Sequence, residues 1–341
     1  MRIATYNVEW FSNLFDDAGA LIDNNSWSGR QDVTKAEQAL ALARVFQAMN
    51  ADAIMVIEAP DVSSHRNGVV ALETFAAYAG IRARNVLVGF PNDTQQEIML
   101  LYDPDTLSAR HDPIGDGTGK KGSPRAPRFD SVFRLDLDID AAPDLIRWSK
   151  PPLEVALKTK GGREVRLIGV HAKSKAPHGA QEGHAAFRIS IENRRKQLAQ
   201  CIWLRQRIEQ HLEDGDDLIV LGDLNDGPGL DDYEKLFGRS SVEIIMGEEG
   251  ATQLFDPHAR LALSQRIGAI PTSSRFRLPP DGRYLSAMLD YIMVSPKLHD
   301  LDPVWRIWHP FDDPAIYADE TLRGALLTAS DHFPVTLDIA L

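Results

Sequence analysis

Polar side chains stand directly after several apolar stretches of this sequence. Asp223 and Asn225 follow Leu218–Leu221 in "LIVLGDLNDGPG", Glu58 follows "IMVI", and His171 follows "VRLIGV". Carboxylate and imidazole groups bind cations and transfer protons, which are two tasks common to catalytic sites. Because side chains two apart in a strand point the same way, Asp223 and Asn225 can face one ligand together.

Four more polar residues occupy comparable places. Asn7 ends "RIATYN", Asp290 begins "DYIMV", and the pair Asp331 and His332 precedes "FPVTLDI". Strand ends on one side of packed sheets can line a cleft, so the sequence predicts that these side chains gather in one. Asp331 and His332 are adjacent and would diverge in a regular strand. They can share the cleft only if the last strand begins after them.

Each of these residues also has a structural explanation when it is taken alone. A single Glu after a buried strand is more often a polar stop, a lone His is more often a hydrogen-bonded structural residue, and 223–228 has the composition of a turn. The recurrence of the pattern along the chain favours a shared site. His171, His178 and His184 do not have the spacing of a zinc site, and no cysteine lies near them.

The elements that must position these residues follow from the apolar patterns. The predicted strands are Arg2–Val8, Ala53–Ile57, Glu97–Tyr102, 131–140, the hairpin 151–173, Leu218–Leu221, Leu289–Val294, 304–309 and a last strand from Phe333. The predicted helices are 34–49, 68–78, 185–211 and 232–237, and 115–128 is a predicted loop. Because the hairpins need antiparallel neighbours, we expect two packed mixed β-sheets flanked by helices, in one α/β domain over 1–341, rather than a doubly wound parallel sheet.

Composition narrows the class of protein. The chain has 341 residues and 43% apolar residues, it lacks an apolar run of membrane-spanning length, and its one cysteine, Cys201, cannot form an internal disulfide. We therefore expect a cytoplasmic protein, and a monomer. The net charge of −12 argues against indiscriminate tight binding to nucleic acid. The segment 147–196 nevertheless has twelve Lys or Arg and four Glu, which is either a phosphate-facing patch or a set of solvated faces.

The motifs that carry these residues resemble those of the endonuclease/exonuclease/phosphatase superfamily. They occur in the family's order over essentially the whole chain, as "TYNVEWF" with Asn7, "IMVIE" with Glu58, "GVHAKSK" with His171 and Ser174, "LGDLND" with Asp223 and Asn225, "LDYIMVS" with Asp290, and "SDHFPV" with Asp331 and His332. The resemblance implies the DNase I-like fold, a four-layer sandwich of two mixed sheets between helices. It also implies a metal-dependent hydrolase of phosphate esters.

The resemblance assigns a Mg²⁺ ion, for which Mn²⁺ can substitute, to one group of residues. Glu58 is the expected direct ligand, and Asn7 and Asp331 are expected to bind through water or to orient the water shell. Ser174 is expected to be a structural hydroxyl, because water attacks the phosphorus directly and no nucleophilic side chain is required.

Proton transfer falls to the remaining residues. Either His332, oriented by Asp290, or Asp223, assisted by Asn225, would activate water, and this choice stays open. His171 would donate to a phosphate oxygen as charge develops on it.

Two departures from the family pattern affect substrate contacts. Ile57 stands where Gln is common before the metal-binding Glu, and Lys150 stands where Arg is common before "PPLEV", which keeps the charge but loses a bidentate fork. The expected substrate is nucleic acid or a small phosphodiester. The alternatives are a phosphomonoesterase acting on a small sugar or lipid phosphate, and an inactive domain that binds phosphate ligands or a protein.

Overall fold

Apolar strands from both ends of the chain form the first of two large β-sheets. The computed structural model describes residues 1–92, 94–136, 143–176, 184–227, 238–250, 252–264, 270–278 and 282–341. The first sheet has the strand order β14-β15-β1-β2-β4-β3 and is mixed, because β1 and β2 are parallel and the other neighbours antiparallel. Its strands are β1 (Arg2–Asn7), β2 (Ala53–Ala59), β3 (Asn85–Val88), β4 (Glu97–Tyr102), β14 (Val304–Ile307) and β15 (Val335–Asp338).

The second sheet comes from the middle of the chain and has the order β13-β10-β9-β8-β5, with β9 and β10 parallel. It contains β5 (Leu107–His111), β8 (Leu153–Thr159), β9 (Glu164–His171), β10 (Leu218–Asp223) and β13 (Asp290–Val294). Gly162, at φ 86°, lies in the turn that joins β8 to β9, as the Gly-Gly pair predicted.

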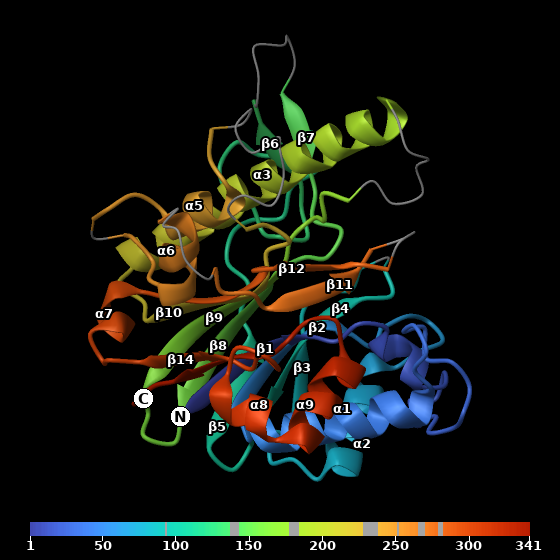
Figure 1. Ribbon diagram of the computed structural model, residues 1–341. Helices are drawn as coiled ribbons and strands as arrows, with labels where there is room; N and C mark the ends of the chain where they lie inside the picture. Colours follow the sequence, from blue (N-terminus) through green and yellow to red (C-terminus); the bar gives the residue numbers. More distant parts are fainter. Residues whose placement is uncertain are drawn as a thin grey trace.

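Three apolar clusters divide the molecule into four layers, which confirms the predicted sandwich. One cluster, with Met55, Leu167 and Ile219 among its members, lies between the two sheets. A second covers the outer face of the first sheet and includes Phe46 and Phe75 of the helices. A third, centred on Trp203, covers the outer face of the second sheet. Figure 1 shows α1 (Lys35–Met49), α2 (Gly68–Ala79) and α9 (Glu320–Ala329) on one side of the paired sheets and α3 (His184–Glu213) and α5 (Ser241–Met246) on the other.

Capping residues mark where the helices begin and end. In α1, the predicted capping box is present: the Thr34 side chain accepts from the Glu37 N–H, and Glu37 accepts from the Thr34 N–H. In α2, Gly80 forms the left-handed C-cap. The helices are α1 (Lys35–Met49), α2 (Gly68–Ala79), α3 (His184–Glu213), α5 (Ser241–Met246), α6 (Pro257–Leu263), α7 (Pro296–His299), α8 (Pro314–Ala318), α9 (Glu320–Ala329) and the 3₁₀ turn η1 (Phe11–Leu14).

Two short hairpins lie outside the main sheets, β6 (Phe133–Leu135) with β7 (Asp144–Ile146), and β11 (Ser274–Arg277) with β12 (Tyr284–Ala287). Neither hairpin was predicted, although β6 falls within the predicted strand 131–140. The predicted helix 232–237 and His178 lie outside the described residues. The predicted end of the second strand before Glu58 was wrong, since β2 continues to Ala59 through a β-bulge.

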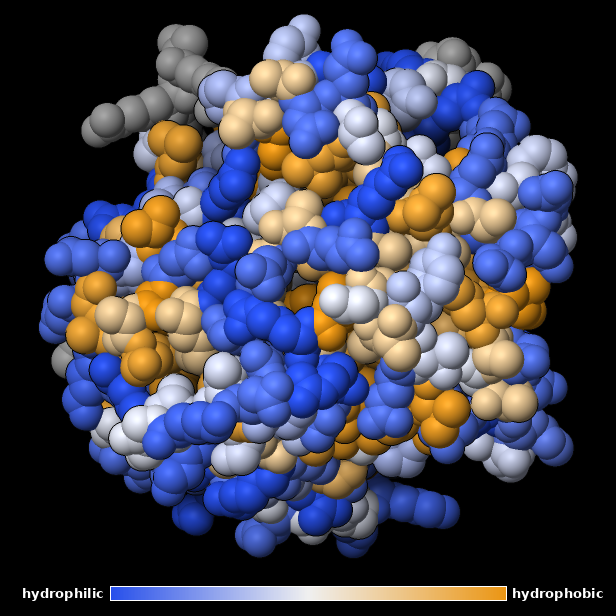
Figure 2. Space-filling model, turned by 90° about the horizontal axis from the view of Figure 1, so that it is seen from below, coloured by the Kyte–Doolittle hydropathy of each residue, from blue (hydrophilic) through white to orange (hydrophobic). Residues whose placement is uncertain are grey.

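The face seen from below in Figure 2 shows hydrophilic and apolar side chains interspersed. Among the helices of the described residues, none is both long and apolar enough to cross a membrane.

Candidate active site

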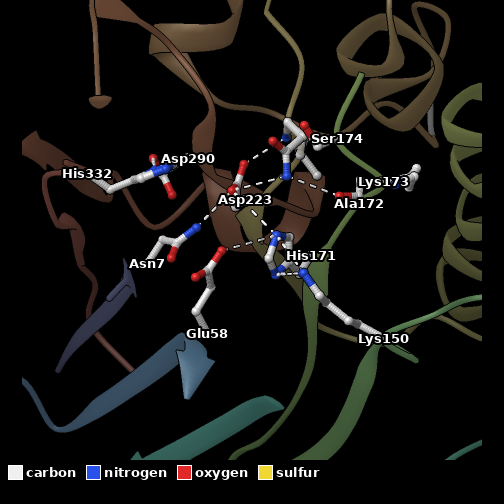
Figure 3. A network of polar contacts seen from close by, with 12 residues as sticks. Asn7, Glu58, Lys150, His171, Ala172, Lys173, Ser174, Asp223, Asp290 and His332 are labelled. Atoms are coloured by element: carbon white, nitrogen blue, oxygen red, sulfur yellow. Dashed lines mark hydrogen bonds and ion pairs between the residues drawn. The ribbon is translucent and has the colours of Figure 1, made fainter. Parts of the chain in front are cut away.

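The strand registers bring the predicted residues to one edge of both sheets. Asn7 ends β1 opposite Ile57 of the parallel strand β2. In the other sheet, Asp223 ends β10 opposite His171 of the parallel strand β9, and it is also paired with Asp290 of β13. Carboxyl ends of parallel strands meet at the same edge of a sheet, so these side chains converge. Asn7 Nδ2 donates to Asp223 Oδ2 at 2.9 Å, which joins the two sheets at this edge (Figure 3).

Glu58 reaches the site through a local distortion of β2. The register shifts between Ile57 and Ala59, and Glu58 itself has φ 59°, in the left-handed region that non-glycine residues seldom adopt. A bulge of this kind turns a side chain out of the alternation of the strand. It directs the Glu58 carboxylate toward His171, whose Nε2 lies 3.9 Å from Glu58 Oε1 (Figure 3).

Asp223 is held by a turn that begins where β10 ends. The Asn225 N–H donates to Asp223 Oδ1 at 2.7 Å, and the Asn225 amide donates to the Ala172 carbonyl at 3.0 Å. Gly222 makes the turn possible, because it has φ 138° and a Cβ at this position would lie 2.0 Å from the Val170 carbonyl oxygen. The spacing Asp-x-Asn thus supplies a carboxylate together with the amide that fixes it.

His332 and Asp290 form a buried pair. His332 Nδ1 lies 2.7 Å from Asp290 Oδ2, and the same oxygen accepts from the Ser273 hydroxyl at 2.8 Å. This leaves Nε2 of His332 as the nitrogen that can meet a substrate. Burial alone would lower the pKa of His332, but the Asp290 carboxylate raises it well above its ordinary value. The raised pKa favours the imidazolium form of His332.

His171 has the opposite character. Lys150 Nζ lies 3.2 Å from its Nδ1 and 3.3 Å from its Nε2, and Nε2 is 3.8 Å from Asp223 Oδ2 (Figure 3). Burial and the Lys150 ammonium hold the pKa of His171 well below its ordinary value. Since an ammonium can only donate, the ring nitrogen it contacts is an unprotonated acceptor, and His171 is neutral.

Burial raises the pKa values of two carboxyl groups in the site, and neighbouring carboxylates add to the rise. Burial raises the pKa of Glu58 to about 7, and Lys150 counteracts part of this rise. Burial likewise raises the pKa of Asp223 to about 6, with Asp290 adding to the rise and His332 opposing it. A cation placed among these groups would favour their ionised forms.

Asp331 lies before the start of β15 at Val335, as the adjacency of Asp331 and His332 required. Its charge acts on Glu58 and His332, which places it beside the cluster, and it also raises the pKa of Glu9. Burial is the larger cause of the rise at Glu9, whose carboxylate pairs with Arg30.

The donor set fits a hard divalent cation. The carboxylate of Glu58, the oxygen of Asn7 and the carboxylate of Asp331 are oxygen ligands of the kind that Mg²⁺ prefers, and Asn7 Oδ1 is buried without a hydrogen-bond partner. A second grouping, of Asp223, Asp290 and His332, has ligand atoms within 4.8 Å of one another. We favour the Glu58 side for the cation, because Nδ1 of His332 is engaged by Asp290 and a protonated imidazole cannot coordinate a metal.

The structure thus brings together the eight residues to which the resemblance assigns metal binding or phosphate chemistry, and it adds three. Lys150 was noted only for replacing Arg, whereas it contacts His171 directly. Ser273 supports Asp290, but nothing in "PTSSRF" distinguishes it from an ordinary loop serine. Glu9 lies two residues after Asn7 within the motif "TYNVEWF", which was its only signal. Ser174 accepts from the Ala176 N–H at 3.3 Å, a local turn contact.

Comparison with protein families and known structures gives an independent result. The model of the endonuclease/exonuclease/phosphatase family matches residues 4–332 of this chain. No curated protein matches the chain in sequence.

Solved structures resemble this one in fold. A truncated TDP2 from Caenorhabditis elegans has a TM-score of 0.50 and 14% identity, with 98% of this chain and 96% of that chain covered. An endonuclease/exonuclease/phosphatase family protein from Bacteroides thetaiotaomicron has a TM-score of 0.50 and 16% identity, with 99% of this chain and 93% of that chain covered. These likenesses, with the four layers, show the DNase I-like fold.

Proposed function

The chain belongs to the endonuclease/exonuclease/phosphatase family, and we propose that it is a Mg²⁺-dependent phosphodiesterase that acts on nucleic acid. The observation that carries the proposal is the buried cluster at the strand ends. There the imidazolium of His332 and the carboxylate of Asp223 lie within 4.8 Å of each other, and Asn7 joins Asp223 to the edge of the other sheet. An imidazolium and a carboxylate so close together can divide the reaction between them: the carboxylate accepts a proton from water and the imidazolium stabilises negative charge on the phosphoryl group.

Glu58 would hold the metal directly, and Asn7 and Asp331 would hold it through their oxygens or through water. When bound, Mg²⁺ supplies charge neutralisation for the phosphate and for the leaving oxygen. The raised pKa of Glu58 supports this assignment, because a buried carboxyl of this kind gains most from a cation nearby.

We assign Asp223 as the general base and His332 as the positively charged group that stabilises the phosphoryl group. Asp223 has a pKa of about 6, so it is ionised at neutral pH, and its two oxygens are fixed by Asn7 and Asn225. A carboxylate with that pKa can accept a proton from the attacking water. His332 is already protonated, so it stabilises negative charge on the phosphoryl group, and Asp290 holds its ring in place.

His171 and Lys150 would face the non-bridging phosphate oxygens. The neutral ring of His171 accepts from Lys150 through one nitrogen and can donate through the other. The ammonium of Lys150 adds a full positive charge beside it. These two residues would stabilise the charge that develops on the phosphate as water attacks.

The experiment that tests the proposal compares a chromogenic phosphate diester with the matching monoester, alongside nicking of a plasmid, in Mg²⁺, in Mn²⁺ and in chelator. We expect metal-dependent cleavage of the diester and nicking of the plasmid. Cleavage of the monoester alone would replace the proposal with a phosphomonoesterase. A folded protein that cleaves neither compound with any metal would favour a domain that only binds.

A further inference from the structure

An arginine at the edge of the site is clamped between two aromatic rings. The guanidinium carbon of Arg275 lies 4.1 Å from the centre of the Tyr284 ring and 5.0 Å from that of Phe311. Arg275 and Tyr284 come from the two strands of the β11–β12 hairpin, and Phe311 comes from the loop after β14. Two rings from separate segments therefore fix the position of one cation.

The hydrogen-bonding capacity of this guanidinium is unused. In the part of the chain that the structure describes, no hydrogen bond or ion pair involves the Arg275 side chain, while its backbone N–H donates to the Asp331 carbonyl at 2.7 Å. A guanidinium carries five N–H donors in its plane, and contacts with ring faces leave those edges open. Tyr284 and Phe311 are themselves exposed, at 55% and 41%.

The clamp stands at the edge of the proposed active site. The bond from Arg275 to Asp331 connects it to the residue next to His332, and the Phe276 ring lies 5.5 Å from the His332 ring. The loop with Phe311 follows Ile307, which is paired with Val335 of β15, at the same end of the sheet as Asn7. The backbone of β11 therefore runs beside Asp331 and His332, and the loop with Phe311 leaves the same end of the first sheet.

We propose that Arg275 binds a second phosphate group of the substrate, a neighbour of the phosphate that is hydrolysed. The inference rests on the proposed function, and it narrows the substrate class to short or long polynucleotides, in which phosphates recur along the chain. A planar fork with free donors matches two phosphate oxygens at once. Because the rings restrict the fork before the substrate arrives, little further ordering is needed on binding.

Three dinucleotides test the inference: TpT, which has one phosphate, and pTpT and TpTp, which carry a second phosphate at either end. We expect the wild-type enzyme to prefer at least one of the latter over TpT by tenfold or more in kcat/KM. Arg275→Met removes this preference and changes the rate on TpT by less than about twofold. Arg275→Lys, which keeps the charge without the fork, retains part of the preference.

Two sets of variants separate the clamp from a general effect of charge. Tyr284→Leu and Phe311→Leu each remove one ring face and are expected to reduce the preference by about two- to fivefold. Arg44→Met removes an exposed arginine of α1 and is expected to leave all three rates unchanged. Calorimetric titration of the three dinucleotides in chelator gives their affinities without turnover.

Different failures have different signatures. If TpT is not hydrolysed but pTpT or TpTp binds to the wild type tenfold more tightly than to Arg275→Met, the proposed function fails and the phosphate contact stands. Equal affinity and equal rates for the three dinucleotides would overturn the inference while the phosphodiesterase remains. A uniform loss on all three in Arg275→Met would also overturn it, since that result indicates a structural arginine.

Discussion

His332 and Asp290 show how burial can make two charges dependent on each other. Each lies at 5% exposure or less, and the carboxylate accepts from Ser273 as well as from His332. The imidazolium is stable in this place only because the carboxylate is 2.7 Å away. The pair therefore behaves as one unit, in which the loss of Asp290 reduces the charge of His332.

The substitution Asp290→Asn tests this dependence of His332 on Asp290. It removes the charge that raises the pKa of His332, so the imidazole becomes neutral at neutral pH. We expect kcat for phosphodiester hydrolysis to fall by about 10²- to 10⁴-fold, the range of acid–base and electrostatic contributions. The measurement is kcat at pH 7 with Mg²⁺, together with circular dichroism to establish that the variant is folded.

Ser273→Ala is the matched control, because it leaves the ion pair in place while it removes the hydrogen bond to the Asp290 carboxylate and the two that the hydroxyl accepts from the Leu289 and Asp290 N–H groups. Its expected loss is about tenfold or less. A kcat of Asp290→Asn within threefold of the wild type would contradict the role given to the pair.

Glu58 links the chemistry of the site to the stability of the chain. Its pKa rises from 4.5 to about 7 on folding, a difference that corresponds to roughly 3 kcal/mol. Because the pKa is raised, the contribution of Glu58 to stability is fully present below pH 4.5 and is lost as the pH rises through 7. In chelator, we expect the free energy of unfolding of the wild type to fall relative to that of Glu58→Gln between pH 5 and pH 8.

Urea unfolding of both proteins at the two pH values measures this difference. Mg²⁺ should restore the free energy of unfolding of the wild type at pH 8, since a ligand that binds only the folded chain stabilises it. It should have little effect on the stability of Glu58→Gln. If the free energy of unfolding depends on pH in the same way in both proteins, the raised pKa of Glu58 is contradicted.

At the scale of elements, the site depends on where strands stop and how closely they approach. β10 and β9 approach so closely at Gly222 that the position has no room for a Cβ, and the next residue is Asp223. The order glycine, then aspartate, places the carboxylate at the end of the strand, directly after a position that has no room for a Cβ. Close packing and the proposed base thus share one short segment.

Gly222→Ala should therefore destabilise the fold. The new Cβ would lie 2.0 Å from the Val170 carbonyl oxygen at a φ of 138°, and we expect a loss of about 3 kcal/mol or more in the free energy of unfolding. Gly324→Ala is the opposite control, because Gly324 is an exposed interior residue of α9 with nothing within 4 Å. It should stabilise by up to about 1 kcal/mol. Urea unfolding that gives both variants the stability of the wild type would contradict this account of Gly222.

The elements that sequence predicts well are those whose pattern is local. The strands around Asn7, His171 and Asp223 have clear apolar runs, and α1 has a capping box, so their limits could be read within a residue or two. The motifs also name the site residues, because each stands at the end of such a strand.

Other features depend on contacts between distant segments and leave no local signal. The bulge at Glu58 depends on how β2 pairs with β4, and the β11–β12 hairpin has short strands with few apolar residues. Ser273 is identified only by its contact with Asp290, and Phe311 only by its contact with Arg275. The residues that orient the site were thus harder to predict than those that form it.

Over the whole molecule, six of the twelve Lys and Arg side chains of 147–196 form ion pairs with carboxylates of the described residues. Arg163 pairs with Asp217, Arg166 with Asp112, and Lys175 with Asp226. These pairs disfavour the broad basic patch that the charge count allowed. Within this segment, Lys150 contacts His171 of the candidate site.

We propose that residues 1–341 form one domain, since the cluster between the sheets joins strands from both ends and from the middle of the chain. Unfolding in urea should then be a single transition, with coincident curves for far-ultraviolet circular dichroism and tryptophan fluorescence. The fluorescence samples both outer layers, because Trp203 of α3 belongs to the cluster on the second sheet and Trp308 belongs to the cluster on the first. Two separated transitions would divide the chain into independent units.

The proposed metal-dependent phosphoesterase site is tested most directly by the rate of phosphodiester hydrolysis. The rate is measured for the wild type, Asp223→Asn and His332→Ala, each in Mg²⁺ and in chelator. We expect the wild type to be active in Mg²⁺, inactive in chelator and active again when Mg²⁺ is returned. Both variants should remain folded, with rates at least 10²-fold lower. Undiminished hydrolysis in chelator, or near-native rates in either variant, would contradict the assignment of this cluster as a metal-dependent phosphoesterase site.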